Sequence, residues 1–245
     1  MSNYFSILLI LSLHFVSCAE KQFNPDDPQG SFAMAREPYD DENYEIAVKK
    51  LGEYKSRFPY SRFATEAELL IAHSYFEMGK YAEASVAYEH FVKLHPKHPE
   101  LELALFRIGM SYWKDAPEEI DREQEFTKLA LEKWERLLKE HPQTSYAAEA
   151  RGFMTEGRRR IAESERFAAR FYCKQGIWHS CAYRYLKILE HYPENLELKE
   201  EAQKKASHAL RKLANEWDEN TKDKNLFFKD MTKDQILQKA NSLTP

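Results

Sequence analysis

The two cysteines in the second half of the chain have the clearest capacity for chemistry. Cys173 and Cys181 flank Gly176, and His179 stands between that glycine and the second cysteine. Two thiolates and an imidazole can bind zinc. A turn at Gly176 would instead bring two helices back together and place both thiols within reach of a disulfide, which is favoured if the chain is exported. The third possibility is that both cysteines are small buried side chains.

The third cysteine, Cys18, ends an apolar stretch at the start of the chain. The first 17 residues contain no Asp, Glu, Lys or Arg, and Ile7 to Leu13 form an apolar core. This apolar run is too short to span a bilayer, which needs about 20 residues. We therefore expect a cleaved export signal and not a membrane-spanning anchor. A small residue before Cys18 resembles the bacterial lipoprotein signal, in which the cysteine receives a diacylglyceryl group and an N-acyl chain. Ala19 in the next position is similar to lipoproteins sorted to the periplasmic face of the outer membrane. The alternative is an ordinary secretory leader with an incidental cysteine.

Other residue patterns give little support for catalysis. Gly79-Lys80 lacks the upstream glycine and the following Ser or Thr of a phosphate loop, and the sequence has no His-Glu-x-x-His zinc motif. Arg158 to Arg160 indicate a solvated helix face, with an acidic partner patch as the alternative. The formal net charge of −4 argues against a basic surface for nucleic acid. We therefore expect no enzymatic activity, no metal and no cofactor other than the lipid on Cys18.

Four prolines end four similar amphipathic segments, which would position these residues. The prolines are Pro59, Pro96, Pro142 and Pro193, and the small residues twelve positions earlier are Ala47, Ala84, Ala130 and Cys181. Large apolar residues stand eight positions before the prolines, at Leu51, Tyr88, Trp134 and Tyr185, and five before them, at Tyr54, Phe91, Leu137 and Ile188. A small residue lets two helices approach, bulky residues fill the contact, and proline ends the helix. This spacing is typical of the second helix of a tetratricopeptide repeat.

The first helices of the repeats fit the same template less completely. Pro38 predicts that the first helix of the first repeat is short or ends early, and the third repeat carries an insertion around Lys114 to Phe126. Ser145 to Gln175 has no proline, so it forms one long helix or two joined by a kink. Asn195 to Trp217 and Thr232 to Asn241 predict two more helices, as a divergent fifth pair or a cap.

The predicted fold is therefore an all-α tetratricopeptide-repeat superhelix, an α-solenoid of about five helix pairs that follows a cleaved lipoprotein signal. The predicted segments are a signal peptide (1–17), a flexible lipid-linked tether (18–27), the solenoid (28–217) and a C-terminal helical cap or tail (218–245).

The first helices of such an array line its concave face, and the template positions on that face are unusually apolar in repeats two and three. They are Leu69, His73, Phe76, Phe106, Met110 and Trp113. We interpret them as a groove for a peptide segment with aromatic side chains. The alternative is that these side chains contact neighbouring helices.

Four short segments are more specific than the repeat spacing. They are Arg57-Phe58-Pro59-Tyr60-Ser61 with Ala64, the His95-Pro96 to Pro99 turn, Asp121-Arg122-Glu123-Gln124, and Ala168 to Pro193, which contains Tyr172, Gly176, Trp178, Arg184 and Tyr192-Pro193. With these segments the chain after Asn24 resembles the BamD (ComL) family, lipoproteins of the outer-membrane β-barrel assembly machinery.

The resemblance implies a non-enzymatic scaffold with several protein partners. In that family the C-terminal repeats bind the periplasmic domain of the barrel protein BamA, and the motif places Arg184 and Trp178 at that contact. The N-terminal repeats are associated with recognition of unfolded outer-membrane barrel proteins, which implies that the groove residues take these clients. Other accessory lipoproteins of the machinery are further possible partners, and the membrane would be reached only through the lipid anchor.

Two interpretations from other classes remain open at the level of sequence. The first is a different periplasmic repeat lipoprotein, a scaffold for pilus assembly or cell-envelope division, which would lack the Arg57 to Ala64 and the Ala168 to Pro193 segments. The second is an enzyme with a cryptic site, which would need converging titratable residues that the sequence does not group.

Overall fold

Helices make up all the regular structure in the described part of the chain. The computed structural model describes residue 24, residues 26–218, residue 225 and residues 227–243. These ranges contain ten α-helices and no strand. The helices are α1 (Pro28–Asp40), α2 (Tyr44–Arg57), α3 (Ala64–Glu77), α4 (Tyr81–Leu94), α5 (Leu101–Asp115), α6 (Glu125–Glu140), α7 (Ala147–Lys174), α8 (Trp178–His191), α9 (Leu196–Asn215) and α10 (Lys233–Ser242).

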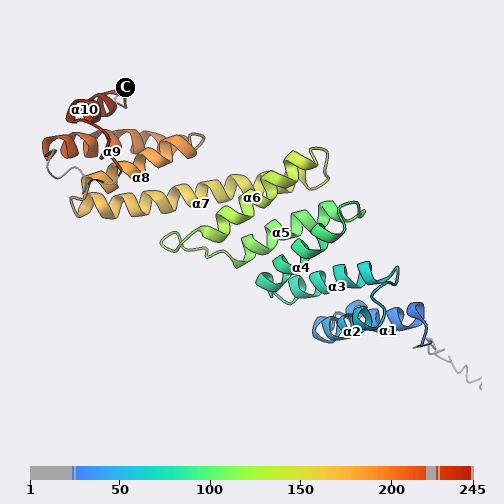
Figure 1. Cartoon of the computed structure of the whole chain (residues 1–245). Helices are drawn as coiled ribbons and strands as arrows, with labels where there is room; N and C mark the ends of the chain where they lie inside the picture. The colour runs from blue at the N-terminus through green and yellow to red at the C-terminus, as the bar shows by residue number, and fades with distance from the viewer. Residues whose placement is uncertain (1–23, 25, 219–224, 226, 244–245) are drawn as a thin grey trace, which may run out of the picture.

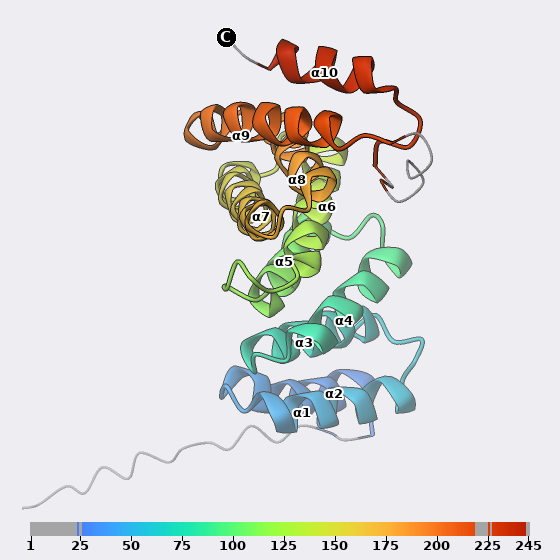
Figure 2. The ribbon, with the colours of Figure 1, turned by 90° about the vertical axis from the view of Figure 1, so that its left-hand side faces the viewer.

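The helices stack in chain order into an elongated array. Each helix packs chiefly against the helix before it and the helix after it. Figure 1 shows α1 and α2 at one end of the array and α10 at the other, and Figure 2 shows the same stack in layers. The predicted all-α tetratricopeptide-repeat superhelix of about five helix pairs is confirmed.

The repeat register read from the prolines is also confirmed. Ala47, Ala84, Ala130 and Cys181 have no exposed surface, and the bulky residues that follow them are buried as well. The buried apolar side chains fall into three clusters, which lie around α1 to α3, around α3 to α7, and around α7 to α10. The long helix α7 joins the last two, since Ala150 belongs to the second cluster and Ala169 to the third.

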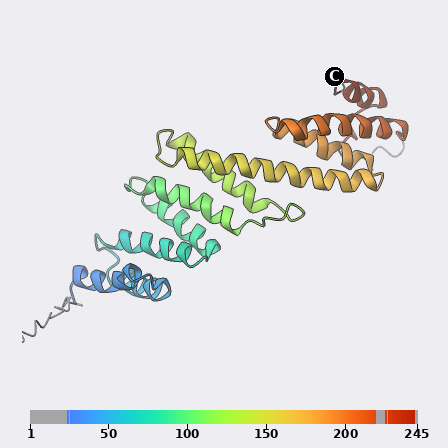
Figure 3. The same ribbon diagram turned by 180° about the vertical axis from the view of Figure 1, so that it is seen from behind.

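Helix α7 runs without interruption over 28 residues. Of the two alternatives for this segment, the single long helix is therefore the one that forms. Figure 3 shows that α7 reaches from α6 to α8 and extends past the end of the α5 and α6 layer. Its C-terminal half, with α8 and α9, forms a separate packing unit.

Two glycines allow the close approaches and turns that the stack needs. A Cβ atom on Gly109 of α5 would lie 2.3 Å from Nε1 of Trp134, so only glycine leaves room for the indole there. Gly176 has a φ of 72° and turns the chain from α7 into α8, a conformation that glycine adopts without steric cost.

Pro38 does not make the first helix short, but the helix ends shortly after it, at Asp40. Helix α1 has 13 residues, and Pro38 lies inside its last turn. The ring therefore removes only one hydrogen bond near the helix end and leaves the preceding turns intact. At the opposite end of the array, α10 packs on α9, and Ser207 donates a hydrogen bond of 2.8 Å to the carbonyl oxygen of Ala240.

Candidate functional site

The predicted open groove on the first helices is not present as such. The six residues concerned are Leu69, His73, Phe76, Phe106, Met110 and Trp113. Leu69, Phe106 and Met110 are only 4%, 5% and 9% exposed. Phe106 stacks on the ring of Tyr146 with centroids 5.0 Å apart, and Trp134 donates a hydrogen bond to its carbonyl oxygen. The prediction of an open groove is wrong for these three residues, because their side chains are almost fully buried.

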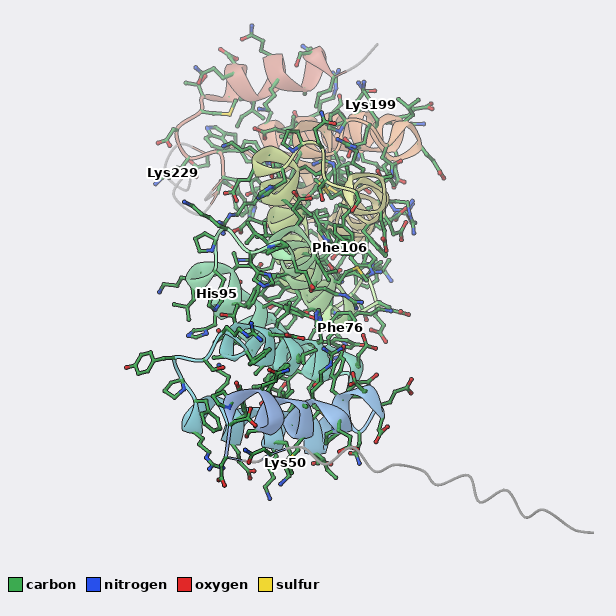
Figure 4. The ribbon with its side chains drawn as sticks, turned by 90° about the vertical axis from the view of Figure 1, so that its right-hand side faces the viewer. Lys50, Phe76, His95, Phe106, Lys199 and Lys229 are labelled. Atoms are coloured by element: carbon green, nitrogen blue, oxygen red, sulfur yellow. A yellow bond between two sulfur atoms is a disulfide. The ribbon has the colours of Figure 1, made fainter. Side chains whose placement is uncertain are left out.

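The other three predicted groove residues are partly buried and already have partners. Nδ1 of His73 lies 2.6 Å from the hydroxyl oxygen of Tyr88. The Arg107 guanidinium lies 4.3 Å from the ring centroid of Phe76, and the Arg160 guanidinium lies 4.1 Å from that of Trp113. Phe76 on α3 and Phe106 on α5 are labelled in the middle of the array in Figure 4. These side chains therefore contact neighbouring helices, which was the alternative to an open peptide groove.

The structure does contain an apolar cleft, but it lies between α2, α3 and α4. Its volume is about 590 Å³. Its lining residues are Lys55, Glu68, Ile71, Tyr75, Ala82, Glu83, Val86, Ala87 and His90. Val86 on α4 is 66% exposed, so its side chain is available at the surface of this space. We call this space the α3–α4 cleft.

A buried carboxylate in the α3–α4 cleft is surrounded by cationic or potentially cationic groups. Glu68 is 8% exposed. It accepts a hydrogen bond of 2.8 Å from Nζ of Lys55, and it lies 2.9 Å from Nδ1 of His90 and 2.8 Å from Nε2 of His95. Burial alone would raise the pKa of Glu68. The hydrogen bonds from Lys55 and His95 and the positive charges nearby outweigh burial and hold this pKa below its ordinary value. The cleft floor therefore carries a compensated charge.

Arg184, the residue expected to contact the barrel protein, lies on α8 against a buried carboxylate of α7. Nη1 of Arg184 donates to Glu165 at 2.7 Å, and Nζ of Lys187 donates to the other carboxylate oxygen at 2.6 Å. Glu165 is 5% exposed. Burial raises the pKa of Glu165, while the hydrogen bonds from Lys187 and Arg184 lower it by more, so the carboxylate stays ionised at neutral pH. On α8 itself, Arg184 and Lys187 share the single negative charge of Glu165, while the neighbouring loop adds the carboxylates of Asp121, Glu123 and Glu125.

The insertion in the third repeat lies beside this ion-paired cluster. Its residues Asp121 to Glu125 line a polar cleft of about 350 Å³ together with Lys128, Ile161, Ser164, Glu165 and Arg184. Gln124 organises the loop, since its side-chain amide donates to the carbonyl oxygens of Glu119 and Arg122 and accepts from the hydroxyl of Thr127. The insertion motif read from the sequence thus forms one wall of the Arg184 cleft.

Trp178, the second residue expected at the barrel-protein contact, faces a different side of α8. Its Nε1 donates to Glu216 at 3.0 Å, and its ring meets that of His208 edge-on with centroids 5.9 Å apart. Trp178 and Arg184 line separate clefts. The structure does not bring the two predicted residues together into one site.

Cys173 and Cys181 are joined by a disulfide. Both thiols are used in this bond, so neither is left to bind a metal with His179. Among the described residues, no group of three or more His, Cys, Asp or Glu side chains is arranged to hold a metal ion.

Cys18 lies outside the described residues, and its lipidation stays a prediction. None of the described helices combines the length and the apolar composition that crossing a bilayer requires.

Sequence reasoning missed two residues of the Arg184 cluster. Lys187 stands three positions after Arg184 on the same helix, and this spacing could have indicated a shared face. Glu165 gave no such signal, because its partners are on the next helix and an isolated glutamate on a long helix is usually solvated.

Comparison with known proteins gives consistent matches over most of the chain. The protein family described as "YfiO: Outer membrane lipoprotein" matches residues 25–225. A protein of Neisseria gonorrhoeae named outer membrane protein assembly factor BamD is 29% identical over 191 residues, which cover 74% of this chain and 71% of that protein. The Vibrio cholerae protein of the same name is 24% identical over 197 residues, which cover 76% and 82% of the two chains. Among solved structures, the TPR domain of P58(IPK) is similar with a TM-score of 0.45 and 16% identity, over 89% of this chain and 66% of that one.

Proposed function

The chain belongs to the YfiO family of outer membrane lipoproteins, and from this premise we propose that it is a non-enzymatic scaffold of outer membrane protein assembly. The resemblance to BamD read from the sequence is confirmed by the family match and by the named relatives. The stacked helix pairs suit a scaffold, because a solenoid offers separate surfaces along its length to different partners. Within this function, the chain binds BamA and receives unfolded barrel proteins.

The observation that carries the BamA contact is the geometry of Arg184 over Glu165. Within the described residues Arg184 donates one hydrogen bond, to Glu165, while a guanidinium has five N–H donors. The remaining donors can pair with a carboxylate of BamA, and a planar guanidinium suits a carboxylate in two parallel hydrogen bonds. Lys187 adds a second positive charge on α8, and these two cations receive the carboxylate. The wall formed by the insertion carries Asp121, Glu123 and Glu125, so it suits a cationic group next to that carboxylate.

The test of this contact uses the full-length protein in detergent and the periplasmic domain of BamA. Arg184→Glu should weaken the affinity at least about tenfold, because like charges would then face each other. Arg136→Glu is the matched control, since Arg136 is exposed on α6 and pairs only within its own helix. A charge reversal on BamA should restore part of the loss. An affinity of Arg184→Glu within about twofold of the unchanged protein would contradict the proposed contact.

Unfolded barrel proteins are proposed to bind in the α3–α4 cleft. Strands of outer-membrane barrels alternate apolar and polar side chains, so an extended segment presents one apolar face and one polar face. Ile71, Tyr75 and Val86 give the cleft an apolar wall, and Lys55 and His90 give it a polar rim. Glu68 on the cleft floor is paired with Lys55, His90 and His95. An apolar segment that covers the floor therefore does not bury an unpaired charge.

The membrane is proposed to be reached through a lipid on Cys18. Two or more acyl chains give stable anchoring, at about 0.8 kcal/mol per buried CH₂ group. Cys18→Ala should therefore release the protein into the soluble periplasmic fraction. Retention of this variant in washed membranes would contradict the lipid anchor. Other lipoproteins of the machinery are further proposed partners of the array.

A further inference from the structure

A further cleft lies between α7, α8 and α9, and it shares no lining residue with the Arg184 cleft. Its volume is about 500 Å³. Its lining residues are Arg170, Cys173, Lys174, Trp178, Tyr185, Glu201, Lys205 and His208. These helices form the last large layer of the array before α10 (Figure 1). We call this space the α8–α9 cleft.

The α8–α9 cleft carries a surplus of positive charge. The one carboxylate that lines it, Glu201, is already paired, because Arg170 donates to both of its oxygens at 3.0 and 2.9 Å and the Tyr185 hydroxyl donates at 3.1 Å. Lys174 and Lys205 form no ion pair with any described residue. The chain as a whole has a net charge of −4, so this local excess is the reverse of the overall balance.

An aromatic wall stands beside these cations. The indole of Trp178 is held by its hydrogen bond to Glu216, and the imidazole of His208 meets it edge-on. Nζ of Lys212 lies 6.0 Å from the centroid of the Trp178 ring. The Trp178 indole and the Arg170 guanidinium are therefore already held by hydrogen bonds within the protein, which lowers the entropic cost of binding.

We propose that the α8–α9 cleft binds an acidic peptide segment of a protein partner, in which a carboxylate stands next to an aromatic or aliphatic side chain. The ammonium groups of Lys174 and Lys205 receive the carboxylate, and the face of Trp178 receives the apolar neighbour. A volume of about 500 Å³ holds a few side chains, as ligand pockets of roughly 300–1,000 Å³ do. A hollow between three helices suits an inserted chain segment better than a flat bilayer surface. This site goes beyond the proposed function, since it requires neither Arg184 nor the α3–α4 cleft.

The experiment measures fluorescence anisotropy of a labelled peptide with the full-length protein in detergent. The probe alternates glutamate and phenylalanine, and a matched peptide carries glutamine in place of glutamate. The glutamate peptide should bind at least about tenfold more tightly than the glutamine peptide. Lys174→Ala combined with Lys205→Ala should abolish this preference. The control, Lys199→Ala combined with Lys204→Ala, removes the same charge from α9 outside the cleft and should keep the preference within about twofold. Lys199 is labelled in Figure 4.

Three outcomes would overturn the proposal. The first is equal binding of the two peptides. The second is an unchanged preference in the Lys174 and Lys205 variant, whose folding is checked by circular dichroism. The third is displacement of the peptide by water-soluble dioctanoyl phosphatidylglycerol at lower concentration than by unlabelled peptide, which would assign the site to a lipid headgroup. Arg184→Glu should leave peptide binding unchanged, so this proposal and the BamA contact fail independently.

Discussion

Arg184 of α8 and Glu165 of α7 form an ion pair of 2.7 Å in which the carboxylate is buried while 35% of the arginine side chain stays exposed. Lys187 binds the other oxygen of the same carboxylate at 2.6 Å. Glu165 thus fixes two cations that belong to one face of α8. An arginine held at its base by a buried anion keeps a defined direction, which a free surface arginine does not.

The first prediction concerns Glu165 as a positioning residue. Glu165→Gln should destabilise the protein by roughly 1–3 kcal/mol, because it removes the anion and leaves two partly exposed cations close together. It should also weaken binding to BamA, since Arg184 loses its fixed direction. Thermal unfolding and BamA affinity of the full-length variant measure the two effects. Glu156→Gln is the control, because Glu156 pairs with exposed Arg159 on the same helix. A Glu165→Gln variant with unchanged BamA affinity would show that Arg184 needs no positioning.

The second prediction is a pH dependence of stability that arises from Glu68. The pKa of this carboxyl in the folded protein lies below its ordinary value, so the folded state holds the ionised form more strongly than the unfolded state does. Its stabilisation is present above the unfolded pKa of about 4.3 and is lost as the pH falls through the lower folded pKa. The difference in melting temperature between the unchanged protein and Glu68→Gln should therefore shrink below about pH 4.

Exposed Glu45 on α2 supplies the control for this measurement. Glu45→Gln should change the melting temperature little at any pH, because surface substitutions are usually within about 0.5 kcal/mol. If Glu68→Gln melts like the unchanged protein at pH 7, the ion-paired cluster on the cleft floor does not stabilise the fold.

The third prediction concerns the disulfide between Cys173 and Cys181. The bond closes a short loop around the Gly176 turn, and a crosslink of this length is expected to contribute about 2–3 kcal/mol by restricting the unfolded chain. Replacing both cysteines by alanine should lower the melting temperature accordingly, and dithiothreitol should have the same effect on the unchanged protein. The alanine variant should not respond to dithiothreitol. Equal melting temperatures with and without the reductant would show that the crosslink contributes no stability.

The repeat register could be predicted from sequence because its signals are local. A small residue such as Ala84 and a proline such as Pro96 are separated by a fixed distance along one helix, and each has a steric meaning of its own. The disulfide was one of three open alternatives for Cys173 and Cys181. Choosing among them depends on how closely α7 and α8 approach at Gly176, which spacing alone does not fix.

The functional surfaces were harder to predict because they depend on what covers each residue. Phe106 occupies a template position that is open in a generic repeat, yet here Tyr146 from the next connection stacks on it. The apolar cleft involves Val86 on a second helix, a position that the repeat spacing does not single out. Glu165 and Arg184 belong to different helices, and no periodicity links their positions.

The last prediction tests the α3–α4 cleft as the site for unfolded barrel proteins. Val86→Glu places a charge at the apolar wall, and because Val86 is 66% exposed, the fold should tolerate it within about 0.5 kcal/mol. The measurement is photo-crosslinking of an unfolded barrel protein to a benzoylphenylalanine introduced in place of Tyr75, which lines the same cleft. Crosslinking should fall about fivefold to tenfold, which corresponds to the loss of about 1–1.4 kcal/mol of apolar contact.

Leu196→Glu, at a position 74% exposed on α9, controls for the added charge and should keep crosslinking within about twofold. BamA affinity should be unchanged in both variants, since the cleft lies several helices away from Arg184. If Val86→Glu crosslinks as well as Leu196→Glu does, the clients bind elsewhere on the array.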